Sequence, residues 1–437
     1  MRPPVEENPS YLAVDYSDDD VILYMDGSVK AGTLQALVER LTLHDHHSFN
    51  ATFLMTYRSF ATGVEIVDRL ARRYSIQPPA GLTPDQVRDW QTRKQKPVKL
   101  RVFNIFKTWL DQYFNEEEDP EVLNKIETFA EEVLARDIQV KMPYQVLLRA
   151  VQRRRTVGDI GARRLTVTTA QPPPPIVPKI NSSRGVQLLD IDPEELARQL
   201  AIFEANLYNR IKPVDCLDTA WSRSNREDGA NIKAMILTSN RMAAWVAQAI
   251  LTHIDAKKRA QVMKYFLQVA DHCRRFNNFS TMFAIMAGAD STPINRLKRT
   301  KDNLSTKSQA LWESLDKTLD IGRKYAGYRE LLKRINPPCI PFLGAYLTFL
   351  TAIEEGNANM LPCPTDPTRK LIHFAKRQKC ADVIREIQQY QATPYTFISL
   401  PVVQTFVRER LENVENGPDA YELSLKLEPR EREDEKM

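Results

Sequence analysis

Glycine, cysteine and long apolar runs are all scarce in this chain of 437 residues. Its 14 glycines are too few for a turn-rich all-β fold or for a set of glycine-rich phosphate loops. The five cysteines are scattered and form no CxxC pair, so they indicate neither a disulfide framework nor a zinc site and favour a reducing compartment. The longest nearly apolar run, residues 340–353, is shorter than a membrane span, and the N-terminus carries no secretory core. These absences predict a soluble, cytoplasmic protein.

The chain also has little excess of one charge over the other, and it lacks the common enzyme motifs. Lys and Arg number 61 and Asp and Glu 56, and a net charge of +5 is too small to indicate a nucleic-acid surface. The sequence has no Walker, HExxH, GxSxG or GxGxxG motif, and no nucleophile–base pair can be named. His44, His46 and His47 cluster, but their spacing fits a loop better than a metal site. We therefore expect no metal, no cofactor and no covalent chemistry.

Helical periodicity is what the sequence does have, and its length allows two or three domains. Residues 1–28 are acidic and rich in turn formers, which predicts a lead-in segment. From 29 to 145 apolar residues recur at helical spacing, Thr33 is a candidate N-cap, and no strand pattern is visible. This segment is expected to be a small helical domain.

A basic and proline-rich stretch, residues 146–190, separates this domain from the next. Pro172–Pro175 cannot continue a helix and favour polyproline geometry, which predicts a linker. We interpret its arginines as solvated, with attraction to acidic lipid headgroups as the alternative. Helical patterning returns over 191–415, where Asp192 marks a helix start, and the mixed charge of 416–437 predicts a disordered tail.

The helix predicted from Pro341 to Gly356 has an unusual face. Apolar residues surround most of its circumference, so protein must cover most of it. Small and polar residues nevertheless recur at i, i+4, i+7 and i+11, on one face: Gly344, Thr348, Thr351 and Glu355. Glu354 lies beside Glu355 at the C-terminal end, where the helix dipole disfavours carboxylates. Either both carboxylates are simply solvated, or the helix presents a slim face and a terminal carboxylate to a partner.

A second helix follows Asp366 and runs to Gln391. Its apolar positions alternate with a basic face, which we interpret as solvated surface; the basic residues are Lys376, Arg377 and Lys379. Two long helices joined by a short loop form a helical hairpin.

Six strings in this half resemble, in family order, the catalytic domain of Ras guanine-nucleotide exchange factors of the Son-of-sevenless type. They are Pro193–Leu200, Phe276–Phe279, Pro293–Leu297, Asn336–Phe342, Glu354–Asn357 and Glu386–Gln391. Gly32–Leu34 and Phe53–Phe60 are similar to the Ras exchanger motif domain that precedes the catalytic domain in this family. The residues of the matching strings are most similar to those of fungal members. The resemblance implies an all-α protein, in which the N-terminal helical domain braces a larger helical catalytic domain with a protruding hairpin.

The resemblance also implies a function and a site. A Ras-type small GTPase would release GDP because the hairpin opens switch I and disrupts the Mg²⁺ and phosphate site. Glu355 takes the position of the glutamate that hydrogen-bonds the phosphate loop. Thr351 stands where many members have a larger aliphatic residue that excludes the metal. The alternatives are a helical scaffold that binds a GTPase without releasing nucleotide, and an exchange factor for a Rap- or Ral-like GTPase.

A hydrophobic slot for switch II is implied too, with Lys379 facing acidic residues of the GTPase. The candidate residues of the slot are Phe283, Tyr325, Tyr328, Phe342 and Leu343. Asp290 and Thr348 are further candidates for contact with the GTPase. Asp290 departs from Son of sevenless, which has asparagine there, and core packing is the alternative role for Phe283, Tyr325 and Tyr328. The implied partner is a nucleotide-free GTPase, bound by a monomer near the inner face of membranes.

Overall fold

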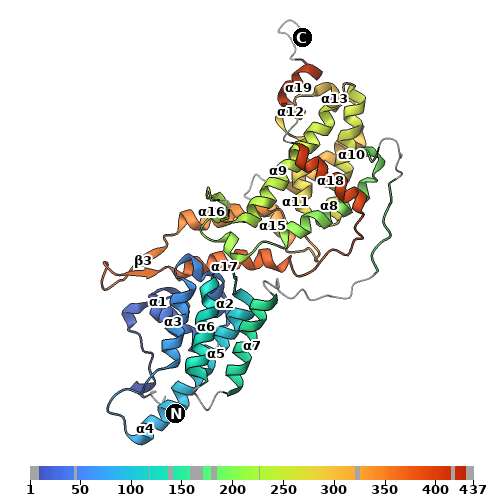
Figure 1. The fold of residues 1–437 in the computed structure, drawn as a ribbon. Coiled ribbons are helices and arrows are strands. Elements are labelled where there is room, and N and C mark those ends of the chain that lie inside the picture. The colour runs from blue at the N-terminus through green and yellow to red at the C-terminus, as the bar shows by residue number, and fades with distance from the viewer. Residues whose placement is uncertain are drawn as a thin grey trace, which may run out of the picture. The chain divides into compact units, whose positions relative to one another are not determined.

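The computed structural model describes residues 9–43, 47–117, 119–135, 141–157, 171–178, 185–225, 227–319, 325–414 and 419–429. Most of these residues are helical, which confirms the expected all-α class (Figure 1). Contacts divide the chain into two compact units. The N-terminal unit comprises residues 1–163, 217–219 and 350–384, and the C-terminal unit comprises 164–216, 220–349 and 385–437.

The N-terminal unit is built on a bundle in which α3, α5, α6 and α7 lie side by side (Figure 1). Its first helices are α1 (Leu34–Leu41), α2 (His47–Thr56), α3 (Gly63–Tyr74), α4 (Pro84–Trp90), α5 (Lys96–Thr108), α6 (Pro120–Phe129) and α7 (Lys141–Val157). Short 3₁₀ or π segments are η1 (Ser10–Leu12), η2 (Asp18–Asp20), η3 (Tyr57–Ser59), η4 (Gln91–Gln95), η5 (Trp109–Tyr113) and η6 (Ala130–Leu134). As predicted, Thr33 caps α1, because its hydroxyl accepts a hydrogen bond from the amide of Ala36 at 3.3 Å.

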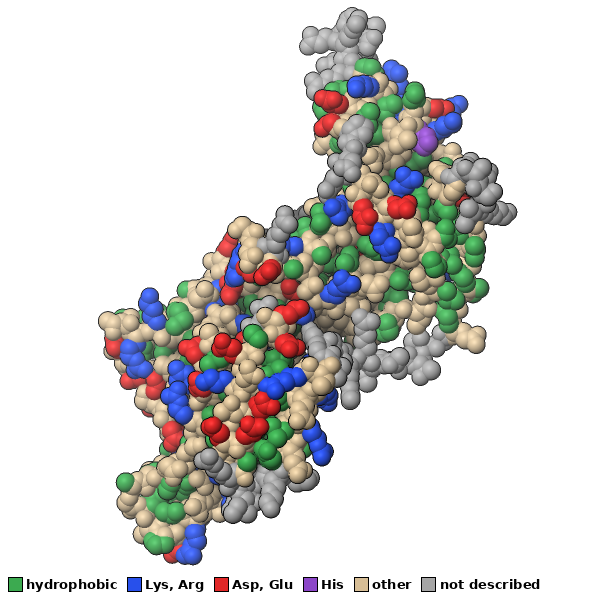
Figure 2. Space-filling model, viewed as in Figure 1, with side chains coloured by type: hydrophobic (Ala, Val, Ile, Leu, Met, Phe, Trp, Pro, Cys, Tyr) green, Lys and Arg blue, Asp and Glu red, His purple; other side chains and the backbone are tan. Residues whose placement is uncertain are grey.

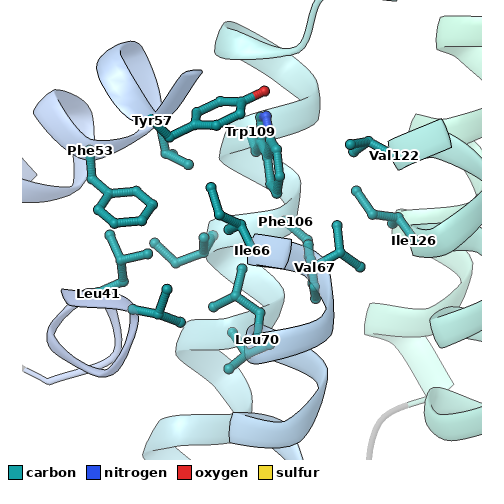
Figure 3. Packing of buried hydrophobic residues seen from close by; sticks show 14 of the residues in the cluster. Leu41, Phe53, Tyr57, Ile66, Val67, Leu70, Phe106, Trp109, Val122 and Ile126 are labelled. Carbon is teal, nitrogen blue, oxygen red and sulfur yellow. The ribbon is translucent and has the colours of Figure 1, made fainter. Parts of the chain in front are cut away.

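Aliphatic and aromatic side chains together fill the core of this bundle. Figure 3 shows Tyr57 beside Trp109 among aliphatic side chains from the surrounding helices, and the two rings meet edge to face with centroids 5.1 Å apart. The Tyr57 hydroxyl and Arg58 Nε both donate to the Asp119 carboxylate. The turn after α2 is thereby fixed to the start of α6.

The sequence pattern indicated no strand in this domain, and that prediction was wrong. A small antiparallel sheet has the order β1-β2-β4-β3, with β1 (Val21–Leu23), β2 (Val29–Gly32), β3 (Met360–Pro362) and β4 (Lys370–Ile372). Strands of three or four residues are too short for a two-residue alternation to be recognised. The predicted second helix of the hairpin accordingly begins at Phe374, because Lys370–Ile372 pair as a strand.

This sheet and one helix attach the hairpin to the N-terminal helices. The hairpin consists of α16 (Leu343–Gly356), β3, β4 and α17 (Phe374–Gln389). Gly32 in β2 lies opposite Ile372 in β4. The Phe374 ring lies 4.6 Å from that of Phe49 in α2. Within the N-terminal unit, these contacts provide the bracing of the hairpin that the resemblance implied.

The C-terminal unit surrounds one central helix, α11, of which all residues except Ala287 are buried. Its helices are α8 (Pro193–Tyr208), α9 (Ala230–Leu251), α10 (Ala256–Arg275), α11 (Phe279–Ala289), α12 (Thr292–Asn295), α13 (Lys298–Asp302), α14 (Thr306–Leu319), α15 (Ala326–Leu332), α18 (Pro401–Asn413) and α19 (Ala420–Leu427). Three short 3₁₀ segments are η8 (Leu188–Asp190), η9 (Pro213–Cys216) and η10 (Ala220–Ser222). Asp192 caps α8, as predicted, by accepting the amide of Glu194 at 2.9 Å.

Several sequence expectations need correction at the segment boundaries. α7 continues to Val157, into the segment assigned to the linker. Arg154 is not solvated but 7% exposed, because it donates to main-chain carbonyls of η5. In the tail, residues 420–427 form α19, since Asp419 caps it and Ser424 is buried. His44, His46 and the rest of the tail lie outside the described residues.

Charge is distributed evenly on the surface in view. Figure 2 shows Lys and Arg side chains interspersed with Asp and Glu rather than gathered by sign. This agrees with the small net charge of the sequence. Among the helices described, none is both long enough and apolar enough to span a bilayer.

Candidate functional site

The polar face predicted on α16 is present in the structure. Thr348 and Glu355 are exposed and Thr351 is half-buried. The remaining circumference is largely buried, with Ala345, Tyr346, Leu347 and Leu350. At the start of the face, a Cβ on Gly344 would collide with the ring of Phe342. α16 therefore exposes a narrow polar strip that ends in a carboxylate.

The two glutamates at the end of α16 have different surroundings. Glu355 is exposed, and its carboxylate makes no hydrogen bond or ion pair with any residue that the structure describes. Glu354 pairs with Lys376, whose Nζ lies 2.6 Å from Glu354 Oε2. The side chain of Asn357 caps the helix by donating to the carbonyl of Ile353 at 2.9 Å. Glu355 is thus the carboxylate that α16 presents to solvent.

The basic face of α17 is not the solvated surface that the sequence indicated. Lys376 and Arg377 are each 1% exposed, since both donate to Asn359 Oδ1, at 2.7 and 3.1 Å. Lys379 is exposed and donates to Asn357 Oδ1 at 3.0 Å. Hydropathy along α17 could not reveal the buried pair, because the acceptor comes from the loop that follows α16.

Four of the residues predicted to bind a partner form an aromatic cluster in the C-terminal unit. Phe283 and Phe342 stack, with ring centroids 4.1 Å apart and planes inclined by 4°. Tyr325 lies 5.8 Å from Phe342, and Tyr328 lies 5.5 Å from Phe283. The Tyr328 hydroxyl also accepts a hydrogen bond from the Phe342 amide at 2.7 Å. The cluster therefore fixes the segment that enters α16.

Burial separates these residues into core and surface members. Tyr328 and Leu343 are 1% and 4% exposed, so core packing accounts for both. Burial also raises the pKa of Tyr328 well above its ordinary value, so the hydroxyl stays protonated. Phe283 is 6% exposed, whereas Tyr325 and Phe342 are half-buried. Tyr325 and Phe342 are the aromatic side chains most accessible to a partner.

A cavity of about 820 Å³ opens beside the stacked rings. It is lined by Ser239, Asn240, Phe283, Ala284, Met286, Ala287, Asp290, Asp316, Lys317 and Phe342. Phe283, Asp290 and Phe342 were named from the sequence, and the structure brings them together here. A lining of apolar side chains with exposed charged residues, Asp290, Asp316 and Lys317, fits a short peptide segment that carries apolar side chains.

Sequence reasoning missed the α9 and α14 residues that line this cavity. Ser239, Asn240, Asp316 and Lys317 occupy ordinary polar positions of amphipathic helices, and nothing in their spacing distinguishes them. Only the packing of α9 and α14 against α11 places them at one site. Within the described ranges, no three His, Cys, Asp or Glu side chains are grouped to hold a metal ion.

Comparison with known proteins identifies two domains in the chain. The RasGEF domain matches residues 195–378, and the RasGEF N-terminal motif matches residues 28–129. The chain is 34% identical over 438 aligned positions to cell division control protein 25 of Candida albicans, covering 97% of this chain and 32% of that protein. The Saccharomyces cerevisiae protein of the same name is 35% identical over 453 positions, covering 98% and 28%. The chain thus spans only about a third of these two relatives.

A third relative is matched over most of its own length. Ras guanine nucleotide exchange factor A of Dictyostelium discoideum is 32% identical over 439 positions, covering 98% of this chain and 68% of that protein. The match extends through both domains and through the hairpin that carries Glu355. With both domain matches in the family order, the chain belongs to the family of Ras guanine-nucleotide exchange factors.

Proposed function

We propose that the chain promotes GDP release from a Ras-type small GTPase by binding the nucleotide-free state more tightly than the loaded one. The observation that carries the proposal is the exposed Glu355 carboxylate, which has no partner among the described residues and ends the polar strip of α16. The name of the Dictyostelium relative, a Ras guanine nucleotide exchange factor, supports the same activity.

The proposed mechanism requires no covalent step. A small GTPase holds its nucleotide through Mg²⁺, a phosphate-loop lysine and switch loops ordered by those contacts. The polar strip of α16 enters beside switch I, and Glu355 accepts hydrogen bonds from donors that lose the phosphate. Thr351, one turn earlier on the same face, places its side chain near the vacated Mg²⁺ site. Stabilising the empty GTPase in this way accelerates release of GDP.

The cavity beside α11 is the proposed docking site for switch II. Phe283 and Phe342 offer stacked rings to its apolar side chains, while the exposed Asp290 and Lys317 contribute charge to the lining. Lys379, exposed on α17, faces acidic residues of the GTPase in this proposal. The complex would contain one chain and one nucleotide-free GTPase, and the chain would reach the inner face of membranes through its partner.

A panel of purified Ras, Rap, Ral and Rho proteins loaded with fluorescent GDP tests the function. The chain is expected to accelerate loss of fluorescence from a Ras-type member. Binding without release would favour the scaffold alternative, and faster release from Rap or Ral alone would reassign the partner. No acceleration with any member would refute the proposal.

Filling the cavity is expected to weaken GTPase binding. Ala287 lines the cavity and is the one exposed residue of α11, so Ala287→Trp adds bulk without disturbing the core. If switch II docks there, KM for the GTPase should rise about 30-fold, which corresponds to losing a hot spot of about 2 kcal/mol. Stopped-flow release of labelled GDP over a range of GTPase concentrations gives kcat and KM.

The matched control for this substitution is Lys264→Trp, an exposed position on α10 that does not line the cavity. Its KM should equal that of the unmodified chain. If Ala287→Trp leaves KM unchanged as well, switch II does not dock in the cavity.

Thr351→Leu is expected to leave GDP release equal or faster. The Thr351 hydroxyl makes no hydrogen bond within the described part of the chain, so its proposed contribution is steric. A larger aliphatic side chain should exclude Mg²⁺ better, and release should become less sensitive to added Mg²⁺. The measurement is the release rate titrated with MgCl₂, with Thr351→Val as control, because valine has the shape of threonine without its hydroxyl. Loss of release in both variants would assign the role to the hydroxyl instead.

A further inference from the structure

Two adjacent glutamates end α16, and only one of them can face outward along the polar strip. Neighbouring side chains on a helix project about 100° apart. A rotation of the last turn would therefore replace the carboxylate of Glu355 with that of Glu354. In the structure Glu355 is exposed and Glu354 is paired, and an interaction that holds Glu354 in place opposes such a rotation.

Lys376 supplies that interaction. Its side chain is 2% exposed, and its Nζ lies 2.6 Å from Glu354 Oε2, 3.4 Å from the Glu354 carbonyl and 2.7 Å from Asn359 Oδ1. An ammonium group has three donors, and three acceptors surround this one. The Glu354 carbonyl is among the last four of α16, which have no partner within the helix. Lys376 thus compensates both the carboxylate and the negative end of the helix.

The second carboxylate oxygen of Glu354 is held as well. Cys380 Sγ donates to Glu354 Oε1 at 3.7 Å. Burial, with the nearby Glu354 charge, raises the pKa of the Cys380 thiol to about 12, so the thiol keeps its proton at neutral pH. Turning Glu354 outward would leave the Lys376 ammonium buried without a counter-charge, which is strongly unfavourable.

The same contacts tie this turn to the N-terminal helices. Asn359 Oδ1 accepts from Arg377 Nη1 at 3.1 Å as well as from Lys376. The other guanidinium nitrogen, Arg377 Nη2, donates to the carbonyl of Ser59 at 3.1 Å. All of these residues belong to the N-terminal unit. The loop that follows Glu355 is therefore held at Asn359 by two consecutive cations of α17.

We propose that Lys376 is a positioning residue for nucleotide release: its ion pair with Glu354 fixes the last turn of α16 so that Glu355 is the glutamate presented to the GTPase. The proposal rests on the proposed function of Glu355. Lys376 is buried and acts only through Glu354, so its loss should lower kcat and leave KM nearly unchanged.

A double-mutant cycle between Lys376 and Glu355 tests the proposal. Lys376→Met should lower kcat for GDP release by about 10- to 100-fold, the cost of misplacing a reacting group by about 1 Å, with KM within about twofold. In that background, Glu355→Ala should cost little more, because Glu355 is already displaced. The effects of the two substitutions would then be strongly non-additive.

Additive effects would overturn the positioning role, since a residue that merely stabilises the fold would lower the rate independently of Glu355. If Lys376→Met does not fold, as judged by thermal denaturation, Glu354→Gln replaces it in the cycle, with the same non-additivity expected. Lys125→Met is the control, because it removes an exposed lysine–carboxylate pair with Asp68, 2.9 Å apart. The kcat of Lys125→Met should equal that of the unmodified chain.

The single variants separate this proposal from the proposed function. A Glu355→Ala variant that releases GDP at the normal rate overturns the role of Glu355, and the positioning proposal falls with it. If Glu355→Ala releases GDP slowly and Lys376→Met releases it at the normal rate, only the positioning role of Lys376 is overturned.

Discussion

Glu355→Ala is expected to slow GDP release by about 10- to 150-fold, the equivalent of losing about 1.5–3 kcal/mol of hydrogen bonding to a charged group. The carboxylate accepts no hydrogen bond within the described residues, so it is unoccupied when a GTPase arrives. Its removal should therefore change the stability of the free protein little and weaken only the proposed complex with the GTPase. The release rate of fluorescent GDP at saturating chain gives the effect on kcat.

Thermal unfolding provides the complementary measurement for this variant. The free energy of unfolding should change by no more than about 0.5 kcal/mol, as for other exposed positions. Glu355→Gln tests the charge alone, because it keeps one acceptor oxygen in place. Its GDP release rate should lie between those of Glu355→Ala and the unmodified chain. Glu132→Ala, at an exposed position of η6, controls for the loss of a surface carboxylate. Normal release by Glu355→Ala would remove the central residue of the proposed mechanism.

Local periodicity predicted the all-α class and the helix α16 because each helix bonds within itself, although several segment boundaries were wrong. The strip on α16 follows from residue spacing alone, and so do the caps at Thr33 and Asp192. The same spacing places Glu355 on the strip and Glu354 beside it. It could not reveal the ion pair of Glu354 with Lys376, a residue that hydropathy assigned to a solvated face and that the structure buries.

Pairing between distant segments is what the sequence could not predict. The sheet joins β2, near the start of the chain, to β4 in the hairpin through Gly32 and Ile372. Residues 350–384 consequently belong to the N-terminal unit, although sequence order assigned them to the second domain. The role of Tyr328 also depends on distant residues. Its aromatic ring would suit a docking slot or a core equally well, and only its neighbours in the structure show that it is buried.

A buried ion pair in the C-terminal unit joins two residues that are 169 positions apart in the sequence. Arg259, 1% exposed, donates from Nη2 to Glu428 Oε1 at 2.8 Å and from Nε to Thr300 Oγ1 at 2.8 Å. Glu428 also accepts the amides of Arg299 and Thr300, at 3.0 and 3.1 Å, at the start of α13. The tail that mixed charge predicted to be disordered thus supplies the carboxylate that compensates a buried guanidinium.

Glu428→Ala is expected to lower the free energy of unfolding by about 3–5 kcal/mol, because Arg259 would remain buried without a counter-charge. Urea unfolding followed by circular dichroism measures the loss, and Glu412→Ala, at an exposed position of α18, should change it by no more than about 0.5 kcal/mol. A loss below about 1 kcal/mol for Glu428→Ala would mean that Arg259 does not depend on this carboxylate.

The same ion pair predicts how the loss of stability in Glu428→Ala varies with pH. Burial alone would raise the pKa of Glu428, but hydrogen bonds from Thr300 and Arg259 outweigh it and hold the pKa below its ordinary value. A carboxylate with a lowered pKa in the folded state stabilises the protein above its unfolded pKa of about 4.3, and this contribution disappears as pH falls through the folded pKa. The difference between the unmodified chain and Glu428→Ala should therefore be constant from about pH 6 to 8 and shrink below about pH 4. A difference that persists undiminished in stronger acid would show that Glu428 stabilises α13 and α10 by packing rather than by charge.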